Sequence, residues 1–370
     1  MTGRRYSHYI GHGMQGEGGL GGVPFGRVKR AFRFRFDPVE SATGHPHPPA
    51  LPVQPACRAA GRAKPLHVTP ASQEAAMRMI TSVGVIGAGQ MGAGIAQVFA
   101  QAGYEVRLSD LSPSQLDAAR SRIAGSTGRA VAKGTLSAEE RDRVLDRVQV
   151  TTALEPIGGA DLVIECATEN EEVKKRILRD LTPLLADRTV LTTNTSSLSI
   201  TRLAAVTDRP QRFMGLHFMN PVPVMKLVEL IRGIATDQAT FASVEAVVAT
   251  LGKTATTSED YPAFIVNRLL VPMINEAVYA LYEGVGNVAS IDAAMRLGAN
   301  HPMGPLELGD FIGLDTCLAI MNVLHDGLGD SKYRPCPLLV KFVEAGWLGR
   351  KSGRGFYDYR AADGVPVPTR

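Results

Sequence analysis

A glycine-rich hexapeptide, GAGQMG at residues 87–92, constrains the fold of this 370-residue chain more than any other feature. Residues 83–86 before it form an apolar run with the length of a buried strand. Behind the glycines, Ile95 and Phe99 recur at helical spacing, and a second strand-like run ends at Asp110. The order of strand, glycine turn, helix and acid-ended strand is typical of a dinucleotide-binding unit.

The turn and the acidic residue predict how a dinucleotide would bind. The glycines permit a tight turn and let the backbone approach a pyrophosphate, which would lie against the N–H groups and positive dipole end of the helix. The predicted cofactor-binding residues of this turn are Gly87, Gly89, Gln90, Met91 and Gly92. Asp110 can accept hydrogen bonds from a ribose and would repel a 2′-phosphate, and Leu111 rather than an arginine follows it. We therefore expect NAD rather than NADP. The alternative to dinucleotide binding is a glycine turn that only packs a helix on a sheet.

Further short apolar runs alternate with charged helical stretches such as residues 171–179. The apolar runs are residues 162–164, 190–191 and 213–216. This alternation predicts a parallel, helix-covered sheet. Beyond about residue 260 the chain has helical stretches, such as residues 263–282, separated by Gly and Pro. The predicted fold is α/β: a Rossmann-type doubly wound sheet over residues 79–260, followed by an all-helical C-terminal domain over residues 261–370.

Residues 1–78 differ in charge and composition from the rest of the chain. They hold 11 Lys and Arg against 4 Asp and Glu, whereas the remaining residues hold 29 against 32. They are rich in Gly and Pro and have no sustained helical period, so we predict a disordered basic leader. A mistaken start codon, with Met79 or Met77 as the true start, explains the leader better than a transit peptide. Nucleic-acid binding is not expected, because only the leader is basic.

Composition also limits the class of protein. No apolar stretch approaches the roughly 18 residues that a membrane-spanning helix needs. The four cysteines are far apart and include no Cys-x-x-Cys pair, which favours reduced thiols over a disulfide framework or a zinc site. We expect a soluble cytoplasmic protein that binds neither a metal nor a membrane.

Three further segments, DLVIE at residues 161–165 with Glu169, TNTSSL at residues 193–198 and GLHFMNPVP at residues 215–223, appear in that order. They resemble signatures of the 3-hydroxyacyl-CoA dehydrogenase family, especially its short monofunctional type, which includes bacterial 3-hydroxybutyryl-CoA dehydrogenases. The resemblance extends from about residue 80 to residue 359. It implies NAD-dependent interconversion of (3S)-3-hydroxyacyl-CoA and 3-oxoacyl-CoA, in fatty-acid or butanoate metabolism. The expected substrate is 3-hydroxybutyryl-CoA.

His217 is the candidate base for this chemistry. Oxidation of a secondary alcohol needs a group that takes the hydroxyl proton while hydride leaves carbon, and imidazole suits neutral pH. His217 ends a predicted strand, and Glu229 lies 12 residues further on in a second strand-like run. Two adjacent strands could bring the carboxylate to the other imidazole nitrogen, where it would fix the tautomer. On the residues alone a structural histidine is the commoner alternative, and the resemblance favours catalysis.

The resemblance also assigns the remaining site residues. It implies that Ser196 hydrogen-bonds near the reacting hydroxyl and that Asn267 completes the active site. It further implies cofactor contacts for Glu169, Lys174 and Asn220, and a CoA contact for Lys133, with Ser196 and Asn267 also facing the substrate.

Each of these assignments has a structural alternative. Asn194 or Ser196 could cap the following helix. Glu169 and Lys174 could belong to the solvated face of a helix. Lys133 could be an ordinary cation at a helix C-terminus.

The C-terminal segment of residues 346–357 also resembles the family, in which its role is structural. In this family the helical domain forms a dimer, so we expect a homodimer. Two other functions stay open: a dehydrogenase of a free hydroxy or sugar acid of the gulonate type, and a non-catalytic, NAD-binding protein like the lens crystallins. The chain is too short for a second catalytic domain, such as a hydratase.

Overall fold

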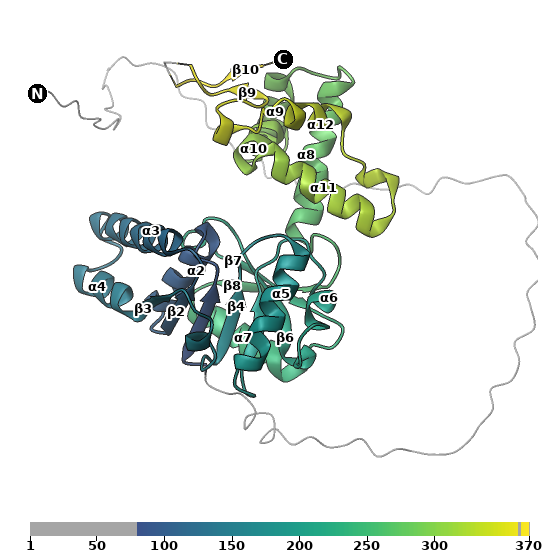
Figure 1. The fold of residues 1–370 in the computed structure, drawn as a ribbon. Helices are drawn as coiled ribbons and strands as arrows, with labels where there is room; N and C mark the ends of the chain where they lie inside the picture. The colour runs from purple at the N-terminus through teal and green to yellow at the C-terminus, as the bar shows by residue number, and fades with distance from the viewer. Residues whose placement is uncertain (1–79, 362–363, 370) are drawn as a thin grey trace, which may run out of the picture. The chain divides into compact units, whose positions relative to one another are not determined.

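The computed structural model describes residues 80–361 and 364–369 of the chain (Figure 1). The predicted leader of residues 1–78 and the alternative starts Met77 and Met79 lie outside these residues. Within them, a sheet with helices on both faces is followed by a helical part (Figure 1).

In the described part of the chain, eight strands form one sheet in the spatial order 3-2-1-4-5-6-7-8. Along the sheet they are β3 (Val148–Thr151), β2 (Glu105–Ser109), β1 (Ser82–Ile86), β4 (Leu162–Glu165), β5 (Val190–Thr193), β6 (Phe213–Phe218), β7 (Leu227–Arg232) and β8 (Thr254–Glu259). The first six run parallel, in the order typical of dinucleotide-binding sheets. β7 is antiparallel to β6, and β8 is parallel to β7. The apolar runs from which a parallel sheet was predicted, residues 162–164, 190–191 and 213–216, all lie in parallel strands. β7 turns back against β6 because residues 219–226 are too few for a crossover helix.

Both faces of the sheet are buried. Val83 and Val85 of β1 belong to one apolar cluster and Ile86 to another, as expected when alternate side chains of a strand point to opposite faces. The first cluster is covered by α2 (Gln90–Gln101), α3 (Pro113–Ala132), α4 (Ala138–Arg147) and α7 (Gln238–Thr250), and the second by α5 (Glu171–Leu181) and α6 (Ile200–Ala204). The Rossmann-type doubly wound sheet is therefore confirmed.

The rest of the described chain is mainly helical and has its own apolar cluster. Its helices are α8 (Val266–Tyr282), α9 (Val288–Gly298), α10 (Pro305–Ile312), α11 (Leu314–Leu328) and α12 (Pro337–Glu344). Short 3₁₀ turns in the whole described chain are η1 (Glu155–Ile157), η2 (Thr182–Leu184), η3 (Pro210–Arg212), η4 (Ser331–Tyr333) and η5 (Arg350–Ser352). The predicted helical C-terminal part is confirmed, with one addition: an antiparallel pair formed by β9 (Tyr357–Asp358) and β10 (Val367–Pro368).

Two buried aspartates hold the end of the chain against these helices. Asp310 of α10 accepts the backbone N–H groups of Phe356 and Tyr357, both at 2.9 Å, and the hydroxyl of Tyr359 at 3.0 Å. Asp292 of α9 accepts the hydroxyl of Tyr357 at 2.8 Å. Burial raises the pKa of Asp310 to about 6. These contacts fix part of residues 346–357, the segment for which the family resemblance implied a structural role.

Candidate active site

Most of the predicted site residues lie at the carboxyl ends of the parallel strands, where ligands bind in open α/β sheets. The glycine turn follows β1, Asp110 follows β2, Glu169 follows β4, Ser196 follows β5 and Asn220 follows β6. His217 lies near the end of β6 itself.

The glycine turn has the geometry that a dinucleotide requires. Gly87 has a φ of +99°, which side-chain-bearing residues rarely adopt, and any Cβ there would press on the backbone of Ala167. At Gly92 a Cβ would collide with the carbonyl oxygen of Gly87, so the helix can start this close to the strand only with glycine. At Gly89 a Cβ would meet nothing within 4 Å. The backbone is therefore bare at the position where a pyrophosphate would approach the start of α2.

Asp110 and Arg122 orient the peptide groups of this turn. Asp110 Oδ2 accepts the N–H of Ala88 at 2.8 Å, and Arg122 Nη1 donates to the carbonyl oxygen of Ala88 at 3.3 Å. In a trans peptide the C=O and N–H point in opposite directions, so Arg122 turns the N–H of Gly89 away from itself. The sequence places no arginine beside Asp110, since Leu111 follows it and is 88% exposed. An arginine of α3, Arg122, instead contacts the glycine turn itself.

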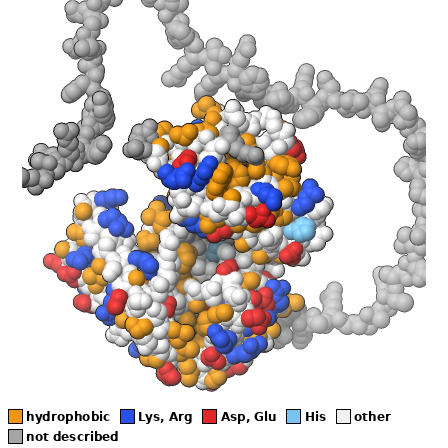
Figure 2. Space-filling model, turned by 45° about the horizontal axis from the view of Figure 1, so that its top comes forward, with side chains coloured by type: hydrophobic (Ala, Val, Ile, Leu, Met, Phe, Trp, Pro, Cys, Tyr) orange, Lys and Arg blue, Asp and Glu red, His pale blue; other side chains and the backbone are white. Residues whose placement is uncertain are grey.

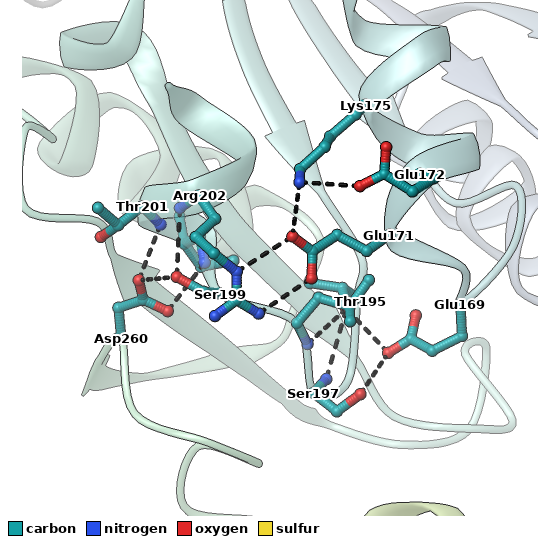
Figure 3. Close-up of polar contacts among 12 residues, drawn as sticks. Glu169, Glu171, Glu172, Lys175, Thr195, Ser197, Ser199, Thr201, Arg202 and Asp260 are labelled. Atoms are coloured by element: carbon teal, nitrogen blue, oxygen red, sulfur yellow. Dashed lines mark hydrogen bonds and ion pairs between the residues drawn. The ribbon is translucent and has the colours of Figure 1, made fainter. Parts of the chain in front are cut away.

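Glu169 connects the loops that follow β4 and β5. Its Oε1 accepts the backbone N–H and the hydroxyl of Ser196, at 2.7 and 2.8 Å, and the hydroxyls of Thr195 and Ser197, at 2.8 and 3.0 Å. In Figure 3 the carboxylate points toward Thr195 and Ser197. Two predicted site residues, Glu169 and Ser196, are thereby brought together.

The capping alternative for Asn194 and Ser196 is wrong. Helix α6 is capped by Ser199, whose hydroxyl accepts the N–H of Arg202. The Oδ1 atom of Asn194 instead accepts the N–H of Phe218 at 2.8 Å, which ties the loop after β5 to β6.

Lys174 is buried, with an exposed fraction of 1%, so the alternative of a solvated helix face is wrong for this residue. Its Nζ atom lies 2.7 Å from Oε2 of Glu165, which is fully buried. The same oxygen accepts the hydroxyl of Thr193, and Glu165 Oε1 accepts the N–H of Ala167. Lys174 therefore neutralises a carboxylate at the end of β4, and its cofactor contact stays a prediction.

Gln90 and Asn220, both predicted to contact the cofactor, meet across the site: Gln90 Nε2 donates to Asn220 Oδ1 at 3.0 Å.

Cys166 lies beneath the glycine turn, with its thiol donating to the carbonyl oxygen of Ile86 at 3.2 Å. Burial, followed by the nearby charge of Glu165, raises the pKa of this thiol. The thiol therefore stays protonated, and we assign it no chemistry.

His217 and Glu229 stand directly opposite each other in the antiparallel pairing of β6 and β7. The distance from His217 Nδ1 to Glu229 Oε2 is 2.7 Å. Glu229 is fully buried, and the His217 side chain keeps 8% of its surface exposed. The predicted contact between the imidazole and a carboxylate from a neighbouring strand is therefore present.

Glu229 also holds the start of the helical part. Its Oε1 accepts the backbone N–H groups of Ile265 and Val266, at 3.0 and 2.9 Å. Burial works to raise the pKa of Glu229, but the hydrogen bonds from His217 and from the N–H of Val266 outweigh it, so the pKa is lowered. Glu229 is thus ionised and accepts only, which places a hydrogen on Nδ1 of His217 and leaves Nε2 free to take a proton.

Asn267 follows this contact directly, as the second residue of α8, and is half-buried. Lys133 is exposed at the C-terminal end of α3. His325 Nδ1 lies 3.3 Å from Oδ1 of its exposed neighbour Asp326, unlike the buried pair of His217.

The sequence did not reveal three contributors to this site: Arg122, the hydroxyls of Thr195 and Ser197, and the N–H groups of Ile265 and Val266. One signal for the last was available, because α8 has no side-chain cap and no acidic residue in its first turn. A helix start of that kind needs an acceptor from elsewhere in the chain.

Across the described residues, no group of three or more His, Cys, Asp or Glu side chains is arranged to hold a metal ion. In the same part of the chain, no single helix is long and apolar enough to cross a membrane. Helices α10 and α11 reach that length and apolarity only as a pair bent by 97°.

The fold and the site define a Rossmann-type oxidoreductase that uses NAD. Comparison with protein families makes the class specific: residues 82–261 match the 3-hydroxyacyl-CoA dehydrogenase NAD-binding domain, and residues 264–359 match the C-terminal domain of the same enzymes. The chain belongs to the 3-hydroxyacyl-CoA dehydrogenase family. As in that family, it is an enzyme that oxidises the hydroxyl-bearing carbon of an acyl-CoA with NAD.

Individual relatives agree with this assignment. The chain is 62% identical to 3-hydroxybutyryl-CoA dehydrogenase of Bradyrhizobium diazoefficiens over 292 residues, which cover 79% of this chain and 99% of that protein. It is 43% identical to 3-hydroxyadipyl-CoA dehydrogenase of Escherichia coli over 283 residues, covering 76% of this chain and 60% of that protein. It is also similar to the crystal structure of (S)-3-hydroxybutyryl-CoA dehydrogenase from Ralstonia eutropha, with a TM-score of 0.75 and 47% identity. The match covers 76% of this chain and 100% of that chain.

Proposed function

We propose that the chain interconverts (3S)-3-hydroxybutyryl-CoA and acetoacetyl-CoA in fatty-acid or butanoate metabolism. The similarity to the 3-hydroxybutyryl-CoA dehydrogenases of Bradyrhizobium diazoefficiens and Ralstonia eutropha supports this substrate. The observation that carries the chemistry is the buried pair of His217 and Glu229, in which His217 lies near the carboxyl end of β6, at the same edge of the sheet as the cofactor turn.

His217 is the general base in this proposal. NAD supplies the acceptor for the hydride that leaves the hydroxyl-bearing carbon. His217 takes the hydroxyl proton at Nε2, because its Nδ1–H is committed to Glu229. The imidazolium that forms is stabilised by the ionised Glu229, as in other pairs of histidine and carboxylate. In the reverse direction His217 returns the proton as a general acid.

Ser196 and Asn267 position the substrate. The Ser196 hydroxyl, which donates to Glu169 at 2.8 Å here, would turn to donate to the oxygen of the substrate hydroxyl, because the proton of that hydroxyl goes to His217. Asn267 can approach the same region from the start of α8, since Val266 before it is held by Glu229. For the cofactor, we propose that Asp110 binds the adenosine ribose of NAD and that Glu169 and Asn220 contact its nicotinamide half. Lys133 is proposed to face the phosphates of CoA.

We propose further that residues 79–260 form the NAD-binding domain and residues 261–370 the substrate and dimerisation domain of a cytoplasmic homodimer. Exposed apolar side chains gathered on the helical part support a dimer, since monomers rarely expose large contiguous apolar patches. Those more than half exposed are Tyr261, Leu269, Tyr282, Val285, Leu297, Phe311, Val365 and Val367. Figure 2 shows hydrophobic side chains gathered on the surface of this part. Light scattering of the purified protein tests the dimer.

Replacement of His217 by Gln tests the proposed chemistry. The variant should lose most turnover of acetoacetyl-CoA while it still binds NADH, because glutamine cannot take up a proton at neutral pH. Full activity in His217→Gln would overturn the assignment of the base. Activity of the parent protein on gulonate rather than acetoacetyl-CoA would favour a sugar-acid dehydrogenase, and no turnover of either would favour a non-catalytic NAD-binding protein.

A further inference from the structure

Two consecutive residues before α8 have an unusual backbone conformation. Ala263 has a φ of 63° and Phe264 a φ of 54°, which is the left-handed region that residues other than glycine rarely occupy. Both side chains are buried, with exposed fractions of 0% and 3%. Such a conformation costs free energy and persists only where the surroundings impose it, so it points to a function.

The conformation has a visible result: it turns two successive backbone N–H groups toward one carboxylate. Phe264 is left-handed, and Ile265 after it has a φ of −97° and a ψ of −58°, in the right-handed region. Successive N–H groups in such an arrangement form a concave anion-binding site, known as a nest. Here the anion is Glu229, whose Oε1 accepts the N–H groups of Ile265 and Val266.

The same segment contacts the histidine of the pair. The centroid of the Phe264 ring lies 5.8 Å from that of the His217 imidazole, and the planes are tilted by 59°. The imidazole is therefore restrained by Glu229 at Nδ1 and by an aromatic ring against its body.

The segment is also held at its other end. Asp260 accepts the hydroxyl of Ser199 at 2.9 Å and the N–H groups of Ile200 and Thr201, both at 2.8 Å (Figure 3). Residues 261–264 thus lie between two contacts of the same kind. Asp260 accepts N–H groups at the start of α6, and Glu229 accepts N–H groups at the start of α8. A relaxed conformation at Ala263 or Phe264 would move the nest while Asp260 and Glu229 stayed in place.

We propose that Ala263 and Phe264 are positioning residues for the catalytic pair, because their left-handed conformation builds the nest that orients Glu229 and, through it, His217. This inference rests on the proposed role of His217 as the base. The nest gives Glu229 three donors in place of one, which keeps the carboxylate ionised and fixed in direction. Without the nest, Glu229 would be a buried carboxylate with one partner, and such a group takes up a proton more readily.

Two substitutions at Ala263 separate this role from simple packing. Ala263→Gly keeps the left-handed conformation without strain, and its kcat and pH profile should match those of the parent. Ala263→Val adds a β-branched side chain that disfavours a positive φ. It should lower kcat by about 10- to 100-fold, the effect of losing a hydrogen bond to a charged group, with NADH binding unchanged. In the oxidation of (3S)-3-hydroxybutyryl-CoA, where His217 must be unprotonated, the acidic limb of the pH profile should move to higher pH, since the pair then binds a proton more readily.

Ala277→Val is the matched control, because it adds the same two methyl groups at a buried alanine of α8 outside the segment. It should leave kcat and the pH profile unchanged. If Ala263→Val does not bind NADH, the smaller β-branched substitution Ala263→Thr replaces it in the same comparison.

The inference is overturned if Ala263→Val keeps the parent kcat and pH profile, or if Ala263→Gly loses as much activity as Ala263→Val. These results are distinct from a failure of the proposed function, which would appear as full activity in His217→Gln. An inactive His217→Gln together with an unaffected Ala263→Val would refute only the role of the nest.

Discussion

Replacement of Glu229 by Gln removes the charge of the catalytic pair with almost no change in shape. A carboxylate only accepts hydrogen bonds, whereas an amide has one accepting oxygen and one donating nitrogen. Glu229 uses both oxygens as acceptors: one for His217 Nδ1 at 2.7 Å and the other for the N–H groups of Ile265 and Val266. An amide can satisfy only one side.

The better arrangement for the amide keeps its oxygen on the two N–H groups and turns its nitrogen toward His217. The nitrogen then donates to Nδ1, which forces the hydrogen of the imidazole onto Nε2, where it blocks proton uptake from the substrate. The same exchange in a serine protease triad lowers kcat by about 10⁴-fold. We expect a loss of about 10²- to 10⁴-fold here, which corresponds to about 3 to 5 kcal/mol in the activation barrier.

The assay is steady-state oxidation of (3S)-3-hydroxybutyryl-CoA by NAD, the direction in which His217 takes up the proton, with NADH binding measured separately by fluorescence. Glu259→Gln, at the exposed end of β8, is the matched control and should behave as the parent. A Glu229→Gln variant that binds NADH and keeps kcat within about threefold of the parent would refute the tautomer argument.

Three further outcomes follow from the structure. Asp110→Ser should raise KM for NAD at least about 10-fold, the effect of losing a charged hydrogen bond, and admit NADP; an unchanged preference would contradict the ribose role. Arg122→Ala should weaken NADH binding about fivefold at constant kcat, whereas Arg129→Ala, an exposed cation on the same helix, should not. Burial raises the pKa of Asp310 from 3.8 to about 6, so its stabilising contribution is full below about pH 4 and is lost, by up to ~3 kcal/mol, as the pH rises through 6. Urea unfolding at several pH values should show this loss in the parent and a flatter profile in Asp310→Asn.

Much of the site could be predicted because its residues occupy fixed places in a repeating pattern. The glycine turn and Asp110 follow from the order of strand, turn and helix, and His217 and Glu229 lie opposite each other on adjacent strands, as expected. The direction of β7 was also predictable, since residues 219–226 leave no room for a crossover helix.

Other contacts could not be predicted because they join loops and helices that are distant in the sequence. Arg122 reaches Ala88 from the third turn of α3, and no local spacing connects the two residues. Lys174 has the sequence neighbours of a solvated lysine, and only its contact with Glu165 explains why it is buried. The left-handed conformation of Ala263 is likewise absent from any propensity, because the surrounding structure imposes it.

The ion pair of Lys174 and Glu165 limits how this sequence can diverge. Loss of either partner alone would strand one charge in the interior, which costs about 3 to 5 kcal/mol and is a large fraction of a typical domain's stability. Simultaneous replacement of both by apolar residues of similar volume avoids that cost. We therefore expect Lys174 and Glu165 to be replaced together, both in evolution and in redesigned variants, although nine residues separate them along the chain.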